Sequence, residues 1–372
     1  MAILLEAVLH VYWPYSEKFH EPNPLFGWRL IPNQTGWSKN EGGKIFLKIN
    51  SKGLRDKEYS YEKGENIFRI LVLGDSYCEA VQVSLAEAFH KRLESLLNQR
   101  SKTTEYEVIN CGVSGYGTDN ELLFYKYEGY KYQPDLVILA FTVGNDISDN
   151  FQGLAVESGK PYFLLGENGL KLMNFPVKRN QSLFRKVKDF SNSYSKLYRF
   201  LYITFRERIT AVGQILNKLR LMKSSPRKVQ HIRNYLVFKS NYTPKLQRAK
   251  EVSEALILEL KKEVETNDAK LLVVLIPKAE QVHEESWFET LKQFSAMRTV
   301  KWNLEKPNLY LKDFFEQNKI DALDLLPEMR ASAKAKKRLF YIGRGHWNSE
   351  GHLFTARLLY DYLINNKYLP NE

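Results

Sequence analysis

Four short polar segments of this chain contain the residue types needed for acyl transfer. Ser76 follows the apolar run 68–74, Gly115 and Asn145 follow two further apolar runs, and His346 lies near the C-terminus. A serine attacks an ester when a histidine within about 2.6–3.2 Å takes its proton and donors face the developing oxyanion. Ser76 is therefore the candidate nucleophile and His346 the candidate base. The backbone N–H groups of Ser76 and Gly115 and the side-chain amide of Asn145 are the candidate oxyanion donors.

The sheet that must position these segments is visible as a series of apolar runs. Such runs are typical of strands buried on both faces of a parallel sheet, and they occur at 68–74, 106–110, 135–141, 270–276 and 320–325. Helical spacing separates them, at 86–98, 118–130, 245–266 and 349–364. This alternation predicts an α/β fold, a doubly wound α/β/α parallel sheet of the flavodoxin-like type. Functional residues of such sheets lie at the carboxyl ends of the strands.

Two regions interrupt this alternation. Residues 1–66 mix Pro, Gly, Asn and aromatic residues, which predicts a β-rich N-terminal extension of short strands. Residues 67–372 form the predicted α/β domain, with a basic helical insertion at about 151–243. Within the insertion, residues 198–219 have the spacing of one apolar helix face. A side helix or lid with a solvated basic face is expected, and attachment to a membrane surface is the alternative.

The ordered set of Gly74-Asp75-Ser76, Gly115, Gly144-Asn145-Asp146 and His346-Trp347-Asn348 resembles the SGNH/GDSL hydrolase superfamily. The stretch from about 22 to 130 looks like a subgroup found in bacterial surface-polysaccharide gene clusters. The ending 346–352 is similar to alginate O-acetyltransferase-like members. This resemblance implies the SGNH hydrolase fold, a serine nucleophile and O-acyl esters of carbohydrate as substrates. No cofactor is expected.

One position departs from the resemblance. Relatives carry an aspartate two or three residues before the catalytic histidine, whereas this chain has Gly343 and Arg344 there. A guanidinium cannot accept the imidazole proton, so Arg344 is expected to turn outward. Either a backbone carbonyl or another carboxylate, such as Glu350 or one from the Asp324 region, should then hold the ring. The alternative is that catalysis has been lost.

Other polar residues near these segments have simpler interpretations. Ser114 is a competing nucleophile, but its surroundings lack the second glycine of the Gly-x-Ser-x-Gly elbow. His352 is expected to pack or cap within the last helix, because one histidine suffices for serine chemistry. Asp75 and Asp146 are expected to accept hydrogen bonds from turn amides.

Composition restricts the class of protein. With 372 residues, 44% hydrophobic and 26% charged, the chain has the balance of an ordinary globular protein with a sizeable core. The sequence contains no run of about 18 apolar residues, so no transmembrane helix is predicted. Cys78 and Cys111 are too few for a disulfide framework and no Cys/His cluster has zinc spacing, so no metal site is expected. Both cysteines are expected to be buried free thiols near each other.

Positive charge is concentrated in one segment. The net charge is +12, and residues 178–250 contain 19 basic and 2 acidic residues. This distribution favours local contact with an anionic membrane surface or an acidic polysaccharide over nucleic-acid binding. Residues 2–10 are apolar but lack a basic start and include Glu6, so no signal peptide is predicted. A cytoplasmic or peripheral membrane location is expected, or an exported or anchored one by resemblance if the N-terminus is truncated.

These features together predict a serine esterase that hydrolyses O-acyl, chiefly acetyl, esters. Its expected substrate is an acylated carbohydrate or a small ester. An SGNH-type O-acetyltransferase of a surface polysaccharide is the first alternative, because it would use the same acyl-enzyme. A catalytically inactive carbohydrate-binding homologue is the second, because of the departure before His346.

Overall fold

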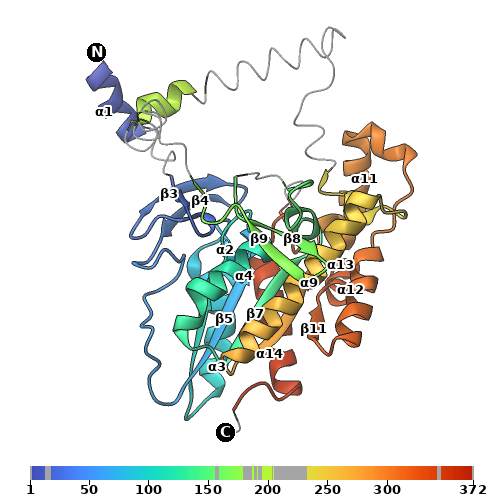
Figure 1. Cartoon of the computed structure of the whole chain (residues 1–372). Coiled ribbons are helices and arrows are strands. Elements are labelled where there is room, and N and C mark those ends of the chain that lie inside the picture. The colour runs from blue at the N-terminus through green and yellow to red at the C-terminus, as the bar shows by residue number, and fades with distance from the viewer. Residues whose placement is uncertain are drawn as a thin grey trace.

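A central parallel sheet organises the chain (Figure 1). The computed structural model describes residues 2–12, 18–155, 159–178, 187, 191, 195–202, 204, 233–341 and 345–370. Its five-stranded sheet has the order β11-β10-β7-β5-β6. The strands are β5 (Ile67–Gly74), β6 (Glu105–Asn110), β7 (Leu136–Thr142), β10 (Lys270–Ile276) and β11 (Asp321–Asp324). This is the 2-1-3-4-5 order of flavodoxin-like sheets, so the predicted fold class is confirmed.

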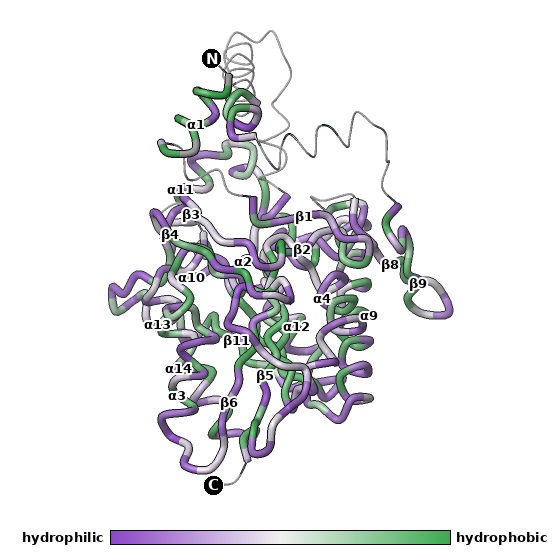
Figure 2. Tube along the Cα trace, turned by 90° about the vertical axis from the view of Figure 1, so that its left-hand side faces the viewer, coloured by the Kyte–Doolittle hydropathy of each residue, from purple (hydrophilic) through white to green (hydrophobic). Residues whose placement is uncertain are grey.

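Helices cover both faces of this sheet. In β5, Ile70 and Val72 face one layer and Leu71 and Leu73 face the other, because successive strand side chains alternate. The first layer contains α3 (Phe89–Arg100), α13 (Leu326–Lys334) and α14 (Ser349–Asn365). The second contains α4 (Thr118–Tyr127), α9 (Pro244–Thr266) and α12 (Lys306–Gln317). Figure 2 shows the strands between α3 and α14 on one side and α4 and α9 on the other.

Short helices begin just beyond the carboxyl ends of three neighbouring strands. They are α2 (Ser76–Glu79) after β5, α5 (Asp146–Asp149) after β7 and α10 (Ala279–Val282) after β10. Other short elements are α11 (Glu284–Gln293), the hairpin of β8 (Tyr162–Gly166) and β9 (Gly169–Met173), and 3-10 helices at 85–87, 129–132, 236–238 and 295–299. Three adjacent strand ends thus lead directly into turns that can present polar groups.

The N-terminal extension is built of two antiparallel pairs. Strand β1 (His20–Asn23) pairs with β2 (Gly27–Leu30), and β3 (Thr35–Asn40) pairs with β4 (Gly43–Lys48). These short strands confirm the predicted β-rich extension. The β3–β4 hairpin lies beside α2 at the carboxyl edge of the sheet (Figure 1).

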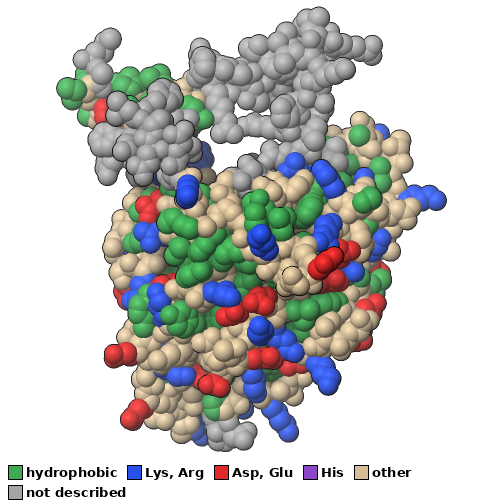
Figure 3. Space-filling model, viewed as in Figure 1, with side chains coloured by type: hydrophobic (Ala, Val, Ile, Leu, Met, Phe, Trp, Pro, Cys, Tyr) green, Lys and Arg blue, Asp and Glu red, His purple; other side chains and the backbone are tan. Residues whose placement is uncertain are grey.

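The extension begins with an apolar helix, α1 (Ala2–Tyr12), which was not among the short strands predicted for it. Its Glu6 carboxylate accepts hydrogen bonds from the backbone N–H groups of Lys196 and Leu197, at 2.6 and 2.9 Å. The N-terminal helix therefore contacts the start of the helical residues 196–202 in the insertion. Hydrophobic side chains of α1 remain at the surface (Figure 3), among them Ile3, which is 87% exposed.

Two further expectations concern the membrane and the thiols. Among the described residues, no helix has the length and apolarity needed to cross a bilayer. Most of the helix predicted at 198–219 lies outside the described residues, so a surface contact through the basic segment 178–250 stays a prediction. Cys78 and Cys111 are both buried and free, as expected.

Candidate active site

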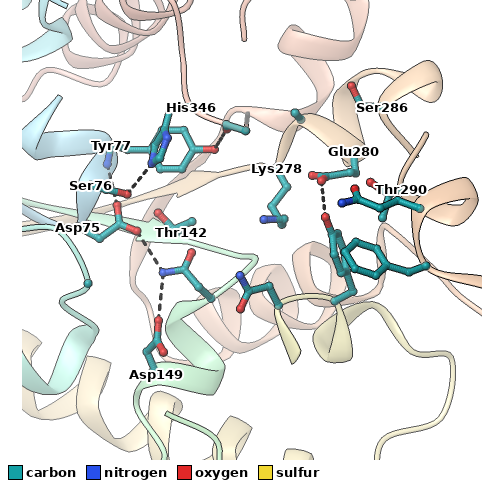
Figure 4. Close-up of a pocket in the computed structure, with 18 of the residues that line it drawn as sticks. Asp75, Ser76, Tyr77, Thr142, Asp149, Lys278, Glu280, Ser286, Thr290 and His346 are labelled. Carbon is teal, nitrogen blue, oxygen red and sulfur yellow. Dashed lines mark hydrogen bonds between the residues drawn. The ribbon is translucent and has the colours of Figure 1, made fainter. Parts of the chain in front are cut away.

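Ser76 lies at the carboxyl end of β5, as the first residue of α2. The turn is fixed by Asp75, whose Oδ1 accepts a hydrogen bond from the Tyr77 backbone N–H at 2.9 Å, the turn role predicted for this aspartate. The Ser76 hydroxyl oxygen lies 2.9 Å from Nε2 of His346 (Figure 4). This separation is within the range in which a histidine can take a serine proton.

His346 is held by a buried aromatic neighbour and by the start of α14. Trp347 is fully buried and forms an antiparallel bridge with Phe340. Asn348 caps α14 by accepting a hydrogen bond from the Gly351 N–H at 2.9 Å. The Tyr77 ring packs against the imidazole with centroids 5.3 Å apart. The His346 ring is therefore held by the Tyr77 ring and by the fixed residues that follow it in the chain.

The second ring nitrogen of His346 has an unforeseen partner. Nδ1 is hydrogen-bonded to the carboxylate of Glu41, which lies between β3 and β4 at the tip of the hairpin. The Glu41 side chain is 14% exposed and that of His346 is 29% exposed. The hydrogen bond from His346 holds the pKa of Glu41 below its usual range, although burial opposes this effect. The carboxylate beside the histidine thus comes from the N-terminal extension.

The prediction that Glu350 or Asp324 holds His346 is wrong, because Glu41 is the carboxylate at its Nδ1. Glu350 is an exposed residue in the first turn of α14. Asp324, the last residue of β11, instead accepts hydrogen bonds from the Leu326 backbone N–H at 2.9 Å and from the Asn308 amide at 2.9 Å. Gly343 and Arg344 lie outside the described residues, as does the predicted outward orientation of Arg344.

Two backbone donors border the cavity beside Ser76. Within the described part of the chain, no protein acceptor takes the backbone N–H of Ser76 or that of Gly115. Gly115 has a φ of +83°, which favours glycine, and a Cβ there would lie 3.3 Å from the Trp28 ring. Ser76 and Gly115, whose N–H groups are the predicted oxyanion donors, therefore line the same cavity.

Asn145 also borders the cavity, but its side-chain amide is engaged. The Nδ2 atom lies 3.1 Å from Asp75 Oδ2, 3.1 Å from Asp146 Oδ1 and 3.3 Å from Asp149 Oδ2. Donation to an oxyanion would require the substrate oxygen to replace one of these carboxylates. Asp146 also accepts from the Thr142 backbone N–H at 2.7 Å, the predicted turn role. Burial and the neighbouring Glu121 and Asp75 carboxylates raise the pKa of Asp146 well above its ordinary value.

The loop that carries Gly115 is held on both sides by other residues. The Ser114 backbone N–H donates to Glu79 at 2.6 Å, and the Trp28 indole donates to the Ser114 carbonyl at 3.0 Å. Glu79 is buried and lies 3.2 Å from His20 Nε2. Ser114 does not line the cavity that Ser76 and Gly115 border. The structure therefore places the competing serine outside the site.

The cavity beside Ser76 has a volume of about 620 Å³. Its far wall includes Lys278, Glu280 and Thr290 (Figure 4), and Tyr235 and Phe294 also line the cavity. The Tyr235 hydroxyl donates to Glu280 at 2.6 Å, and the Lys278 ammonium lies 5.4 Å from the centre of the Tyr235 ring. Sequence reasoning missed this wall. Lys278 and Glu280 follow the carboxyl end of β10, so the rule that found Ser76 could have found them.

The second histidine of the C-terminal segment, His352, lies within α14. His352 is buried, accepts from the Phe89 backbone N–H at 3.3 Å and stacks on the Phe89 ring. Burial lowers the pKa of His352 to about 3, so its predicted packing role is confirmed. Among the described residues, no group of three or more His, Cys, Asp or Glu side chains is arranged to hold a metal ion.

Comparison with solved structures finds distant likenesses. The structure is similar to an α/β hydrolase from the metagenome of Lake Arreo, Spain (12% identity, 84% of this chain, 99% of that chain, TM-score 0.42). It is also similar to an acetyl xylan esterase (12%, 80%, 100%, 0.40) and a GDSL-like lipase from Bacteroides thetaiotaomicron (10%, 80%, 88%, 0.37). No protein family model and no curated protein matches the chain. At these identities and TM-scores, activity has to be argued from the chain's own residues.

Proposed function

We propose that this protein is a serine esterase that hydrolyses O-acyl esters through an acyl-enzyme on Ser76. One observation carries the proposal: the Ser76 hydroxyl lies 2.9 Å from His346 Nε2 at the wall of a cavity of about 620 Å³. Ser76 and Gly115 both line this cavity, and among the described residues their backbone N–H groups have no protein acceptor. Nucleophile, base and donors are the parts that acyl transfer requires.

The reaction would proceed in two balanced halves. Ser76 Oγ bonds to the ester carbonyl carbon while His346 Nε2 takes the hydroxyl proton, and the carbonyl electron pair moves onto oxygen. The backbone N–H groups of Ser76 and Gly115 stabilise this oxyanion. Its collapse breaks the bond to the alcohol oxygen, which takes the proton from Nε2. Water then attacks the acyl-enzyme by the same steps, releasing the acid and restoring Ser76.

The far wall of the cavity supports an acylated carbohydrate as substrate. Tyr235 offers an aromatic ring, and Lys278, Glu280 and Thr290 offer hydrogen-bonding side chains around it. A binding site that combines an aromatic ring with a few fixed polar groups suits a polyhydroxylated ring. Acetyl esters of an oligosaccharide are therefore the first substrates to try.

Two measurements on one protein preparation test the proposed reaction. A serine-directed fluorophosphonate should label wild type at Ser76, and Ser76→Ala should remove both the label and aryl acetate hydrolysis. The expected loss in turnover is at least about 10⁴-fold. Labelling of a different residue, or no labelling of a folded protein, contradicts the proposal.

An O-acetyltransferase would use the same acyl-enzyme and differ only in the acceptor. Incubation with an acetyl donor and an unacetylated oligosaccharide separates the two reactions, since hydrolysis releases acetate and transfer acetylates the sugar. The inactive homologue was suggested by the missing aspartate. The Glu41 contact at His346 Nδ1 removes that reason for preferring it.

A further inference from the structure

The hairpin that carries Glu41 is fastened to the segment that follows α2. The Asn40 amide donates to the Val81 carbonyl at 2.6 Å, and its oxygen accepts from the Gly42 backbone N–H at 2.8 Å. One side chain thus ties the hairpin turn together and joins it to the segment after the nucleophile. The position of Glu41 is set by contacts outside His346 itself.

The hairpin turn at Gly42 packs directly against the backbone of Gln82. A Cβ at Gly42 would lie 1.7 Å from the Gln82 carbonyl oxygen and 3.0 Å from the Tyr341 hydroxyl. Tyr341 donates to that same carbonyl at 3.2 Å, and its backbone N–H donates to the His346 carbonyl at 2.9 Å. Hairpin tip, Gln82 and the histidine segment therefore form one packed unit. A side chain at position 42 would separate its parts.

We propose that Glu41 is the positioning residue for His346, supplied by the N-terminal extension in place of an acid near the histidine in the chain. This inference rests on the ester hydrolysis proposed above. With Nδ1–H donated to the Glu41 carboxylate, Nε2 faces Ser76 as an acceptor. When Nε2 takes the Ser76 proton, the imidazolium holds both protons and the ionised Glu41 stabilises its charge. The Nε2 proton then passes to the leaving alcohol, and Glu41 gains no proton.

The charges around the imidazole agree with this role. Asp75 and Tyr77 lie on the nucleophile side of His346, and Tyr341 lies on the hairpin side. Burial raises the pKa of Asp75 and of both tyrosines. Glu41 is the carboxylate in direct contact with the ring, and its pKa is lowered by that contact. An ionised acid at Nδ1 is therefore present across the neutral range.

Replacing the carboxylate gives the first test. Glu41→Gln should lower kcat for an aryl acetate by about 10²–10⁴-fold with KM changed by less than about threefold, because the contact serves the transition state. The pH profile of Glu41→Gln should also differ in shape from that of wild type, because the carboxylate at Nδ1 is lost. Glu65→Gln, the same change at an exposed position of the extension, should match wild type.

Chemical rescue distinguishes positioning from a structural role. Glu41→Ala removes the carboxylate and leaves space, so added formate should restore part of its turnover but none in His346→Ala. Glu41→Asp should retain more activity than Glu41→Gln. Full activity in Glu41→Gln overturns the inference. The inference is also overturned if Glu41→Ala folds but is inactive, is not rescued by formate and keeps the wild-type shape of the pH profile. Ser76 labelling of wild type reports separately on the proposed function.

The hairpin can also be displaced with its carboxylate intact. Gly42→Ala should lower kcat by about 10-fold or more, because the tip cannot remain against Gln82. Gly64→Ala is the matched control, since a Cβ there meets the flexible end of the Ile67 side chain. An unchanged kcat in Gly42→Ala would show that the contact of the hairpin tip with Gln82 does not determine the position of His346.

Discussion

The N-terminal extension and the insertion are each anchored to the carboxyl edge of the sheet by one buried cation, but the partners differ. Arg55 of the extension is 1% exposed and Lys160 of the insertion is 3% exposed. The Arg55 guanidinium donates to three backbone carbonyls, those of Glu79, Ala80 and Val83, at 2.7, 2.9 and 2.6 Å. Lys160 donates to the Asp119 carboxylate at 2.6 Å and to the Asn120 amide oxygen at 2.7 Å. One anchor uses neutral acceptors and the other uses a titratable one.

The two anchors also hold different parts of the site. Arg55 fixes the segment after Ser76, and the same extension carries Glu41 to the histidine. Lys160 fixes the start of α4, which begins three residues after Gly115, and the insertion also supplies Tyr235 to the cavity. Changes in the extension should therefore affect every ester, whereas changes in the insertion should depend on the size of the substrate.

Loss of the extension's anchor should have the largest effect on stability. Arg55→Met leaves the carbonyls of Glu79 and Val83 without a donor, while that of Ala80 still accepts from the Val83 backbone N–H. Each unsatisfied group costs about 1–3 kcal/mol, so we expect a loss of about 3–5 kcal/mol in the free energy of unfolding. Burial lowers the pKa of Arg55 to about 10, so the anchor stays charged at neutral pH. Urea denaturation measures the loss.

A matched control exists in the same extension. Arg29 is 43% exposed and is paired with Glu21, so Arg29→Met should cost less than about 1 kcal/mol. Equal losses for the two arginines would mean that the three carbonyl contacts of Arg55 do not hold the extension.

Loss of the insertion's anchor should depend on pH. Burial raises the pKa of Asp119 and the Lys160 ammonium opposes that rise. In Lys160→Met the folded-state pKa of Asp119 should rise further. When the folded-state pKa of an aspartate lies above its unfolded-state pKa, the protein loses stability as pH rises from the unfolded-state value to the folded-state value. We expect a deficit of about 3 kcal/mol at pH 8 and a smaller one at pH 5. Urea denaturation at both pH values tests this, and a deficit that is larger at pH 5 would contradict the anchor assigned here.

The sheet was predictable because burial on both faces requires continuous apolar strands. The runs at 68–74, 135–141 and 270–276 correspond to β5, β7 and β10. Helices α11, α12 and α13 were not predicted, because their polar residues mask a short apolar face. Ser76 and His346 were found because each borders a regular element whose end lies at the same edge.

Glu41 could not be found in this way. The sequence Asn40-Glu41-Gly42-Gly43 is typical of an exposed hairpin turn, and nothing local indicates which part of the sheet the tip will meet. Lys160 was equally hidden, since a lysine between glycine and proline is expected at the surface. Both residues depend on contacts between the sheet and a segment added to it, which local spacing does not record.

The insertion's contribution to the site should appear in KM. Tyr235→Ala should raise KM for an acetylated oligosaccharide by about 3–10-fold, the scale of one aromatic contact, with little change for an aryl acetate. Tyr235→Phe keeps the ring and loses the hydrogen bond to Glu280, so it separates stacking from orientation. Tyr130→Ala, at a half-exposed position away from this cavity, is the control. Equal effects on both substrates would show that Tyr235 does not contact the sugar.

The smallest effect should come from His20, at the outer edge of the extension's contacts with the Gly115 loop. Burial lowers the pKa of His20, but the hydrogen bond and charge of Glu79 outweigh burial, so the pKa lies above its ordinary value of 6.5. A histidine with a raised folded-state pKa contributes stability that is complete below its unfolded pKa and is lost as pH rises through the folded value. His20 has a side chain 37% exposed, so solvent screens the pair and His20→Ala should lower Tm by only about 1–2 °C at pH 6. At pH 9 the difference should vanish, because the imidazole is then neutral in both states.

Thermal denaturation of wild type and His20→Ala between pH 6 and pH 9 is the measurement. A Tm difference that grows with pH would mean that His20 stabilises the loop as a neutral ring, and that the ion pair with Glu79 is not what the extension contributes there.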